Sequence, residues 1–304
     1  MSEADTGTQG SPTGPEHVDA AAAGTARRRR GPLHLLPATG LIGLVIVAGI
    51  VAVALVSLVW TPHDPLQAAP EQRLSGSTPQ HPLGTDRYGR DVASILMAGA
   101  QITLLVGCVA VAIAVLIGTP LGVLAGMRRG WTEELVMRGS DVVLAFPALL
   151  LAIMASAVMG ASTWSAMAAI GLASVPGFAR VARAGTLQVM SSDFILAARV
   201  AAQPGARIAR RHVLPNIVGL VVVQASVTFA LAILAEAALS FLGLGTPPPE
   251  PSWGRMLQSA QDHLAVAPHL AVWPGLAIAL AVLGFNLLGD GLRDVLDPRT
   301  RGRR

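Results

Sequence analysis

The chain has 304 residues, of which 52% are hydrophobic and 13% charged, and its mean hydropathy of +0.57 is far above that of an average soluble domain. Its net charge of +4 comes from arginine alone, because none of the 22 basic residues is lysine. A P-loop and a Schiff-base enzyme both need a lysine, so both are excluded, and the single Cys108 excludes an internal disulfide framework.

The chain begins with a polar segment, residues 1–30, that is rich in Ser, Thr, Gly and Ala and ends in four arginines. This composition predicts a disordered cytoplasmic tail. An apolar stretch follows from about Leu36 to Trp60, and we expect a first transmembrane helix within 31–62. A secretory signal peptide is the alternative, but its apolar part is usually about 7–15 residues long, so the greater length here favours an uncleaved span.

After a polar segment at 63–94, which we expect outside the cytoplasm, five more stretches have the apolar character of membrane spans. They run over about 102–127, 136–159, 164–178, 218–242 and 271–289. The stretch 164–178 is short, so we expect its helix to continue past Arg180 and Arg183, with those side chains snorkelling toward water. The sequence predicts an all-α integral membrane protein with six transmembrane helices, a core at 95–292, an inner loop at 185–216 and a cytoplasmic tail at 293–304.

The arginines indicate the orientation of these spans. Eighteen of them fall on one side and four on the other, namely Arg73, Arg87, Arg90 and Arg255. Because positive residues concentrate on the cytoplasmic side, both termini are expected in the cytoplasm of a bacterial cell with the chain in its cytoplasmic membrane. All five tryptophans lie near expected span ends, as in an interfacial aromatic belt. They are Trp60, Trp131, Trp164, Trp253 and Trp273.

Short motifs recur in order along the chain. The first reads HPLGTD-x-x-GRD and consists of His81, Pro82, Gly84, Asp86, Gly89, Arg90 and Asp91 with the residues between them. Later motifs contain, in order, Arg138 with Asp141, the Ala-Phe-Pro run ending at Pro147, Glu236 with Ser240, the Pro-Ser-Trp-Gly run with Trp253, and a segment with Asn286 that closes at Arg299. With these motifs, residues 81–299 resemble the second, C-type permease of the dipeptide, oligopeptide and nickel family of ABC importers.

Permeases of that class share a cytoplasmic element with Glu-Ala-Ala, a Gly four residues after the second Ala, and a downstream Leu-Pro. Here those positions are Leu196-Ala197-Ala198, Ala202 and Leu214-Pro215, so the Glu and the Gly are replaced. Pro204 disfavours helical dihedrals at the preceding residue and suits the start of a helix. We therefore expect the break between two short helices to have moved from Ala202 to the tripeptide Gln203-Pro204-Gly205.

The resemblance implies a type I importer permease that forms half of a pathway for peptides or a similar small solute. It implies as partners a second permease subunit, two ATPase subunits that use ATP and magnesium, an extracytoplasmic substrate-binding protein and membrane lipid. The residues expected to contact the ATPase are Ala197, Ala198, Arg199, Ala202, Pro204, Gly205, Arg207, Arg211, His212, Leu214 and Pro215. No catalytic residue, metal ligand or bound cofactor is expected on this chain, and no nucleic-acid surface, because the arginines lie between apolar segments.

Several of these residues have a simpler structural explanation. Arg207 is equally well an orientation charge, and His212 is better explained as a structural imidazole than as a catalytic one. Asp141 and Glu236 lie in or near spans, where an ionisable residue is a functional candidate, but either could make local hydrogen bonds at a helix end. The pathway or structural candidates are Asp141, Pro147, Glu236, Ser240 and Asn286.

Two other function classes remain as alternatives. A secondary transporter driven by an ion gradient would carry charged residues at mid-membrane, for which only Asp141 and Glu236 qualify. An intramembrane enzyme would need a catalytic constellation, and neither an HExxH nor a GxSxG motif occurs.

Overall fold

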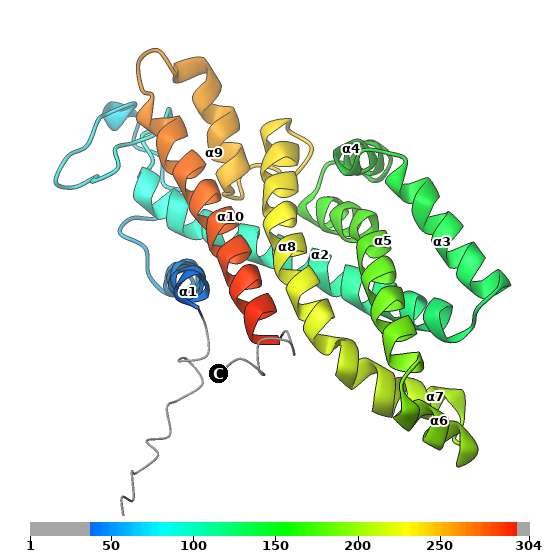
Figure 1. The fold of residues 1–304 in the computed structure, drawn as a ribbon. Coiled ribbons are helices and arrows are strands. Elements are labelled where there is room, and N and C mark those ends of the chain that lie inside the picture. The colour runs from blue at the N-terminus through cyan, green and yellow to red at the C-terminus, as the bar shows by residue number, and fades with distance from the viewer. Residues whose placement is uncertain (1–36, 297–304) are drawn as a thin grey trace, which may run out of the picture.

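The computed structural model describes residues 37–296, which form helices joined mostly by short connections, apart from the long segment 58–91 between the first two helices (Figure 1). The predicted tail at 1–30, most of the tail at 293–304 and the motif end at Asp297 to Arg299 lie outside the described residues. The longer helices are α1 (Ala38–Ser57), α2 (Val92–Met127), α3 (Trp131–Leu144), α4 (Ala148–Met159), α5 (Thr163–Met190), α8 (Leu214–Phe241) and α10 (His269–Leu296). The shorter ones are α6 (Asp193–Val200), α7 (Gly205–Ile208) and α9 (Trp253–Ala260).

In the part of the chain that the structure describes, five continuous helices are long and apolar enough to cross a membrane. They are α1, α2, α5, α10 and the helix from Gly205 to Phe241 that contains α7 and α8. The expected span 136–159 is different, because α3 and α4 meet at an angle of 83°. Pro147, at the amino end of α4, lacks an amide hydrogen and disfavours helical dihedrals at Phe146, which explains the bend. The bent pair brings the number of spans to the expected six only if it counts as one.

The core depends on close approach between helices. α2 carries Gly118, Gly122 and Gly126 at four-residue spacing on the face that packs against α5. A side-chain carbon at Gly118 would lie 2.6 Å from the Val175 carbonyl oxygen, and one at Gly122 would collide with the Ala179 carbonyl. Without a hydrophobic driving force inside lipid, such small-residue contacts hold helices together through van der Waals packing. α2 and α5 therefore form the tightly packed centre beside which α8, α1 and α10 lie (Figure 1).

α5 reaches Met190, which confirms that the short apolar stretch 164–178 continues past Arg180 and Arg183. The expectation that these side chains snorkel toward water stays a prediction, and both arginines also bind carboxylates on α3. Arg180 Nη2 lies 2.6 Å from Asp141, and Arg183 Nε lies 2.7 Å from Glu133. These pairs fasten α3 to α5.

Two further expectations need correction. The inner loop expected at 185–216 begins later, since α5 ends at Met190, and it contains the short helices α6 and α7. Trp253 is not part of an interfacial belt, because it is only 3% exposed and its Nε1 donates a hydrogen bond to the Leu96 carbonyl at 2.9 Å. It packs in a cluster of α2, α8 and α10 residues that includes Ile233 and Phe285.

Candidate functional site

Candidate residues gather at both ends of the helical bundle. At the end that carries α9, Asp86 organises the HPLGTD-x-x-GRD loop: its carboxylate accepts hydrogen bonds from the backbone amides of Tyr88 (2.8 Å) and Arg90 (2.9 Å). The same carboxylate pairs with the Arg90 guanidinium at 2.6 Å. Gly84 and Gly89 adopt positive φ of 83° and 78°, which only glycine does readily. These motif residues build the loop.

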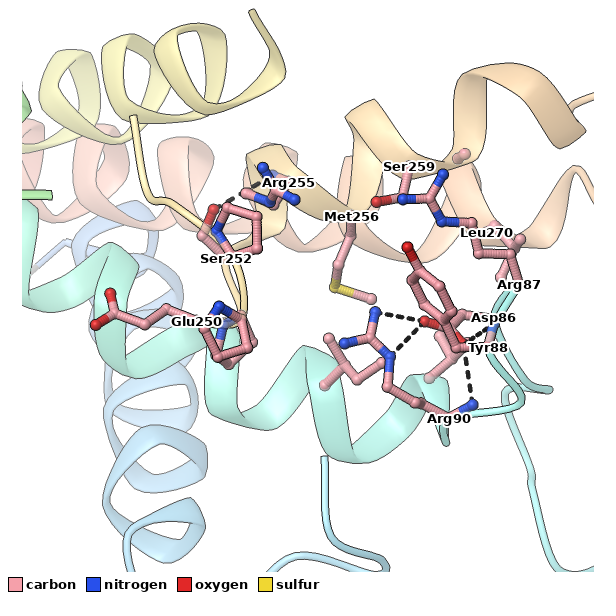
Figure 2. Close-up of a pocket in the computed structure, with 16 residues that line it drawn as sticks. Asp86, Arg87, Tyr88, Arg90, Glu250, Ser252, Arg255, Met256, Ser259 and Leu270 are labelled. Atoms are coloured by element: carbon pink, nitrogen blue, oxygen red, sulfur yellow. Dashed lines mark hydrogen bonds and ion pairs between the residues drawn. The ribbon is translucent and has the colours of Figure 1, made fainter. Parts of the chain in front are cut away.

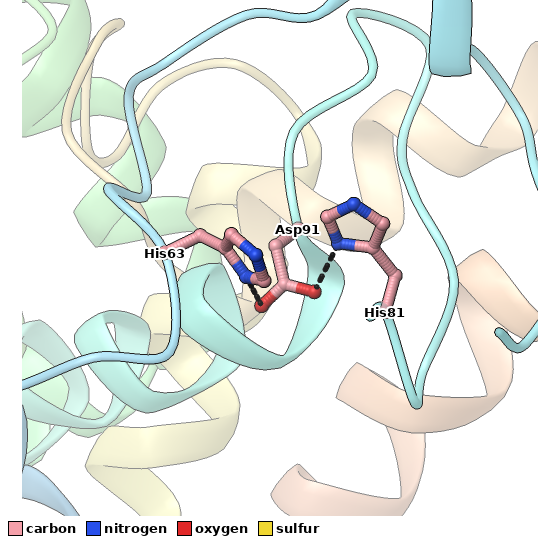
Figure 3. A group of neighbouring side chains, drawn as sticks. All are labelled: His63, His81 and Asp91. Atoms are coloured by element: carbon pink, nitrogen blue, oxygen red, sulfur yellow. Dashed lines mark hydrogen bonds and ion pairs between the residues drawn. The ribbon is translucent and has the colours of Figure 1, made fainter. Parts of the chain in front are cut away.

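Asp91 joins this loop to α2. Its Oδ2 accepts from the backbone amide of Ser94 at 2.8 Å and from the Ser94 hydroxyl at 2.6 Å, so it caps the helix. Its Oδ1 lies 3.0 Å from His81 Nδ1 (Figure 3). Burial raises the pKa of Asp91, but hydrogen bonds from Ser94 and His81 outweigh it, so the pKa lies below its ordinary value.

His63 completes a group whose three possible ligand atoms, from His63, His81 and Asp91, lie within 4.8 Å of one another (Figure 3). Both Asp91 oxygens already accept hydrogen bonds from protein groups, and His81 Nε2 lies 2.8 Å from Gln72 Oε1. His63 Nδ1 is farther away, at 3.8 Å from Asp91. These hydrogen bonds explain why the three side chains lie together: they hold the loop against the start of α2.

A cavity of about 340 Å³ lies between this loop and α9 (Figure 2). The loop contributes Arg87, Tyr88 and Arg90, and α9 contributes Arg255. The Tyr88 ring lies 4.7 Å from the Arg87 guanidinium and 5.0 Å from that of Arg90. Burial, together with the nearby charge of Arg87, lowers the pKa of Arg255. The cavity is therefore rich in positive charge.

Two of the pathway candidates, Glu236 and Ser240, lie near the end of α8 and bind to each other there. Glu236 is 1% exposed, and Ser240 Oγ donates to its carboxylate at 2.7 Å. The same hydroxyl accepts the Thr246 amide at 3.0 Å, while Gly243 at φ 79° ends the helix. Gly254 lies so close to α8 that an added side-chain carbon would be 2.8 Å from the Ala237 Cα. Glu236 and Ser240 thus hold the turn that leads to α9.

The other pathway candidates are spread over the molecule. Asp141 is paired with Arg180, and Arg138 pairs with Glu134 on its own helix at 2.8 Å. Pro147 is exposed at the α3–α4 bend, and Asn286 is exposed on α10. Among residues 37–296, Asp141 pairs with Arg180 and Glu236 with Ser240, so a charged site shared by Asp141, Glu236 and Asn286 at mid-membrane has no geometric support.

At the opposite end, α6 lies beside α7 (Figure 1). Ile195 and Ala198 of α6 are buried in a cluster with Ile208, Val213 and other residues of the bundle end. The rest of the helix is exposed and carries three large apolar side chains, Phe194 (46% exposed), Leu196 (55%) and Val200 (88%), beside the exposed charged residues Asp193 and Arg199. α6 is therefore anchored by one face and presents an apolar surface on the other.

The link from α6 to α7 departs from the expected break. Ala202 has φ 51°, and two hydrogen bonds end α6: the Gln203 amide to the Ala198 carbonyl (3.1 Å) and the Ala202 amide to that of Arg199 (2.9 Å). This is a Schellman motif with alanine at the position that favours glycine. The prediction that the break had moved to Gln203-Pro204-Gly205 is wrong in its main point, because the left-handed residue stays at Ala202. Pro204 does precede a new helix, at its N-cap.

The chain then runs without interruption into α8. A π-helical turn from Ala209 to Val213 joins α7 to α8, and Pro215 lies in the first turn of α8. Arg207, Arg211 and Leu214 are exposed, whereas His212 is partly buried with its ring 6.1 Å from that of Phe194. Displacement of α7 must therefore act directly on a membrane-spanning helix.

Comparison with known proteins decides the family. Residues 118–302, more than half of the chain, match the family described as binding-protein-dependent transport system inner membrane component. The chain belongs to this family of ABC importer permeases. The permease is 40% identical over 261 residues to the dipeptide transport system permease protein of Alkalihalophilus pseudofirmus, with 86% of each chain covered. It is 41% identical over 269 residues to the glutathione transport system permease protein of Pectobacterium atrosepticum, with 88% of each covered.

The fold of the permease is also found in a solved transporter. An inward-facing structure of the MetNI methionine ABC transporter matches with a TM-score of 0.57 at 18% identity, covering 67% of this chain and 96% of that chain. The permease thus has a type I importer permease fold. Its family members are transporter subunits in the inner membrane, so it is a multi-pass transport protein and not an enzyme. The alternative of a secondary transporter gains no support.

Three features of the permease were missed from sequence. The α3–α5 ion pairs join residues 39 positions apart in one case and 50 in the other, which no local pattern reveals. The arginine-lined cavity brings together three of the four minority-side arginines, Arg87 and Arg90 from one loop and Arg255 from α9, and that grouping of positive charge was the available signal. The buried face of α6 could have been found from the three-residue spacing of Ile195 and Ala198, which leaves the other residues of the helix exposed.

Proposed function

We propose that the permease moves dipeptides or similarly small peptides inward, as half of a pathway completed by a second permease. Two ATPase subunits, which use ATP and magnesium, grip α6 and α7 on the cytoplasmic side. A substrate-binding protein docks at the α9 end, outside. Both termini then lie in the cytoplasm, with residues 63–91 outside and 191–204 inside. The names of the dipeptide and glutathione relatives support a peptide cargo.

The observation that carries this proposal is the exposed apolar face of α6. An apolar surface on a short helix outside the spans marks a protein interface. Ile195 and Ala198 fix the helix to the bundle, so a force on its exposed face is passed to α5 and α8 and is not lost in loop motion. A grip that differs between the ATP-bound and ATP-free states would shift the pathway between outward and inward forms.

The test places a charge on the gripping face. Leu196→Asp or Val200→Asp should lower recovery of the ATPase with the tagged permease by about tenfold or more, since an unpaired buried carboxylate costs well over 1.4 kcal/mol. Val266→Asp is the matched control, because Val266 is 73% exposed at the α9 end. Equal ATPase recovery with all three variants would overturn the proposal.

A further inference from the structure

The cavity between the HPLGTD-x-x-GRD loop and α9 has an uncompensated positive charge. Among residues 37–296, Arg90 has a carboxylate partner, Asp86, but neither Arg87 nor Arg255 does. Arg87 Nε is buried and has no hydrogen-bond partner within this part of the chain. Glu250 also lines the cavity, but its carboxylate receives a hydrogen bond from Thr163 at 3.3 Å and turns away from the arginines (Figure 2). Within residues 37–296, the guanidiniums of Arg87 and Arg255 therefore lack a carboxylate partner.

The surroundings make this arrangement costly without a ligand. Arg255 lies in the first turn of α9, where the helix dipole disfavours a cation. A second cation, Arg87, extends from the facing loop toward Ser259 on the same helix (Figure 2). An unsatisfied guanidinium N–H that is shielded from water loses hydrogen-bond energy. A carboxylate between Arg87 and Arg255 would remove the repulsion and satisfy the buried donor.

We propose that this cavity binds an acidic side chain on the surface of the substrate-binding protein, and so forms a specific contact of the docked complex. The inference rests on the proposed function and adds the chemistry of recognition. The composition of the rim favours a protein as the source of the carboxylate. Tyr88 is 47% exposed between two arginines, and Tyr and Arg are the residues that dominate protein interfaces. Pro248, Pro249 and Pro251 form the opposite rim with little conformational entropy to lose on docking.

The test measures binding of the substrate-binding protein to the assembled importer. The complex of both permeases and the ATPase is held in lipid nanodiscs, and the probe is the purified binding protein that stimulates its ATP hydrolysis. Arg255→Gln and Arg87→Gln should each weaken binding by about tenfold or more, the usual value of a charge-assisted hydrogen bond. Arg255→Lys keeps the charge and should recover most of the affinity. Glu71→Gln removes one charge from an exposed position outside the cavity and should change affinity by less than about twofold.

A charge swap identifies the carboxylate. The permease carries Arg255→Glu, and the Asp or Glu of the binding protein that contacts the cavity is changed to Arg. The altered binding protein should bind the Arg255→Glu permease again, and it should bind the unaltered permease more weakly. Unchanged affinity of Arg255→Gln and Arg87→Gln, in complexes that retain their ATPase, would overturn this inference alone. Binding of free Ala-Ala to the complex in the absence of the binding protein, abolished by Arg255→Gln, would also overturn it by making the cavity a substrate site. Loss of the ATPase from the unaltered complex would count against the proposed function itself.

Discussion

At the residue scale, Ala202 has a left-handed backbone conformation, φ 51°, that glycine adopts more readily than alanine. A left-handed conformation costs a non-glycine residue about 1–2 kcal/mol. Glycine avoids this strain, but its greater conformational freedom in the unfolded chain lowers the stability and offsets part of the gain. Ala202→Gly should therefore raise the stability of the α6–α7 link by up to about 1 kcal/mol. The readout is the apparent melting temperature of the purified complex.

Ala201 provides the matched control for this substitution. It has φ −73°, an ordinary right-handed value, so Ala201→Gly should lower the melting temperature because only the entropy cost remains. A decrease for both variants would mean that Ala202 is not strained.

Asp91 gives a pH dependence with a definite sign. Its folded-state pKa lies below the ordinary value of 3.8, so its ionised form stabilises the fold at neutral pH. That stabilisation is complete above about pH 4–5 and is lost as the pH falls below the ordinary pKa toward the lower folded one. The melting temperature of the unaltered permease should fall steeply on acidification through this range.

Asp91→Asn removes the titrating group at the cap. Asn keeps one oxygen that can cap α2, but it loses the charge and the second acceptor oxygen, so the variant should be less stable at neutral pH by about 1.5–3 kcal/mol, the usual value of a hydrogen bond to a charged group. Its further loss of stability below pH 4 should be smaller than that of the unaltered chain. Parallel pH profiles for the two proteins would contradict the role of Asp91 as an ionised cap.

At the scale of elements, the glycine stripe of α2 sets its distance from α5. Gly122→Ala places a methyl group against the Ala179 carbonyl, and overpacking of this kind costs about 1–3 kcal/mol. Gly139→Ala on α3 meets nothing within 4 Å and should be neutral or stabilising by up to about 1 kcal/mol. Melting temperatures in one detergent compare the two, and an equal response would show that α2 and α5 are not in tight contact.

The helices differ in how well they could be predicted from the sequence. Hydropathy located α1, α2, α5, α8 and α10, because a span of lipid requires a continuous apolar run that is visible locally. It could not distinguish a straight span from the bent pair α3 and α4, although Pro147 marked the place. Trp253 was assigned to an interface because position alone suggested it, whereas its burial depends on helices far apart in sequence. The motif residues Asp86, Asp91 and Glu236 were found readily, but their hydrogen-bonding roles became clear only from the structure.

At the scale of the whole molecule, the two ends of the bundle are coupled through continuous helices. α8 runs from the turn beside α7 to Glu236, whose contact with Ser240 holds the approach to α9. α2 likewise begins at the Asp91 cap and ends among residues that pack with α6. A movement imposed at α6 can thus reach the arginine-lined cavity through packed helices with no flexible linker between them.

The most direct test of this account is the side of the membrane on which α6 lies. In a Cys108→Ala background the chain has no other cysteine, so single cysteines at Val200 and Val266 can be labelled with a membrane-impermeant maleimide. In cells that lack the ATPase subunits, Val200→Cys should react in inverted vesicles and not in spheroplasts, and Val266→Cys should show the reverse pattern. Labelling of Val200→Cys from the outside would contradict the account, because the ATPase could not then reach α6.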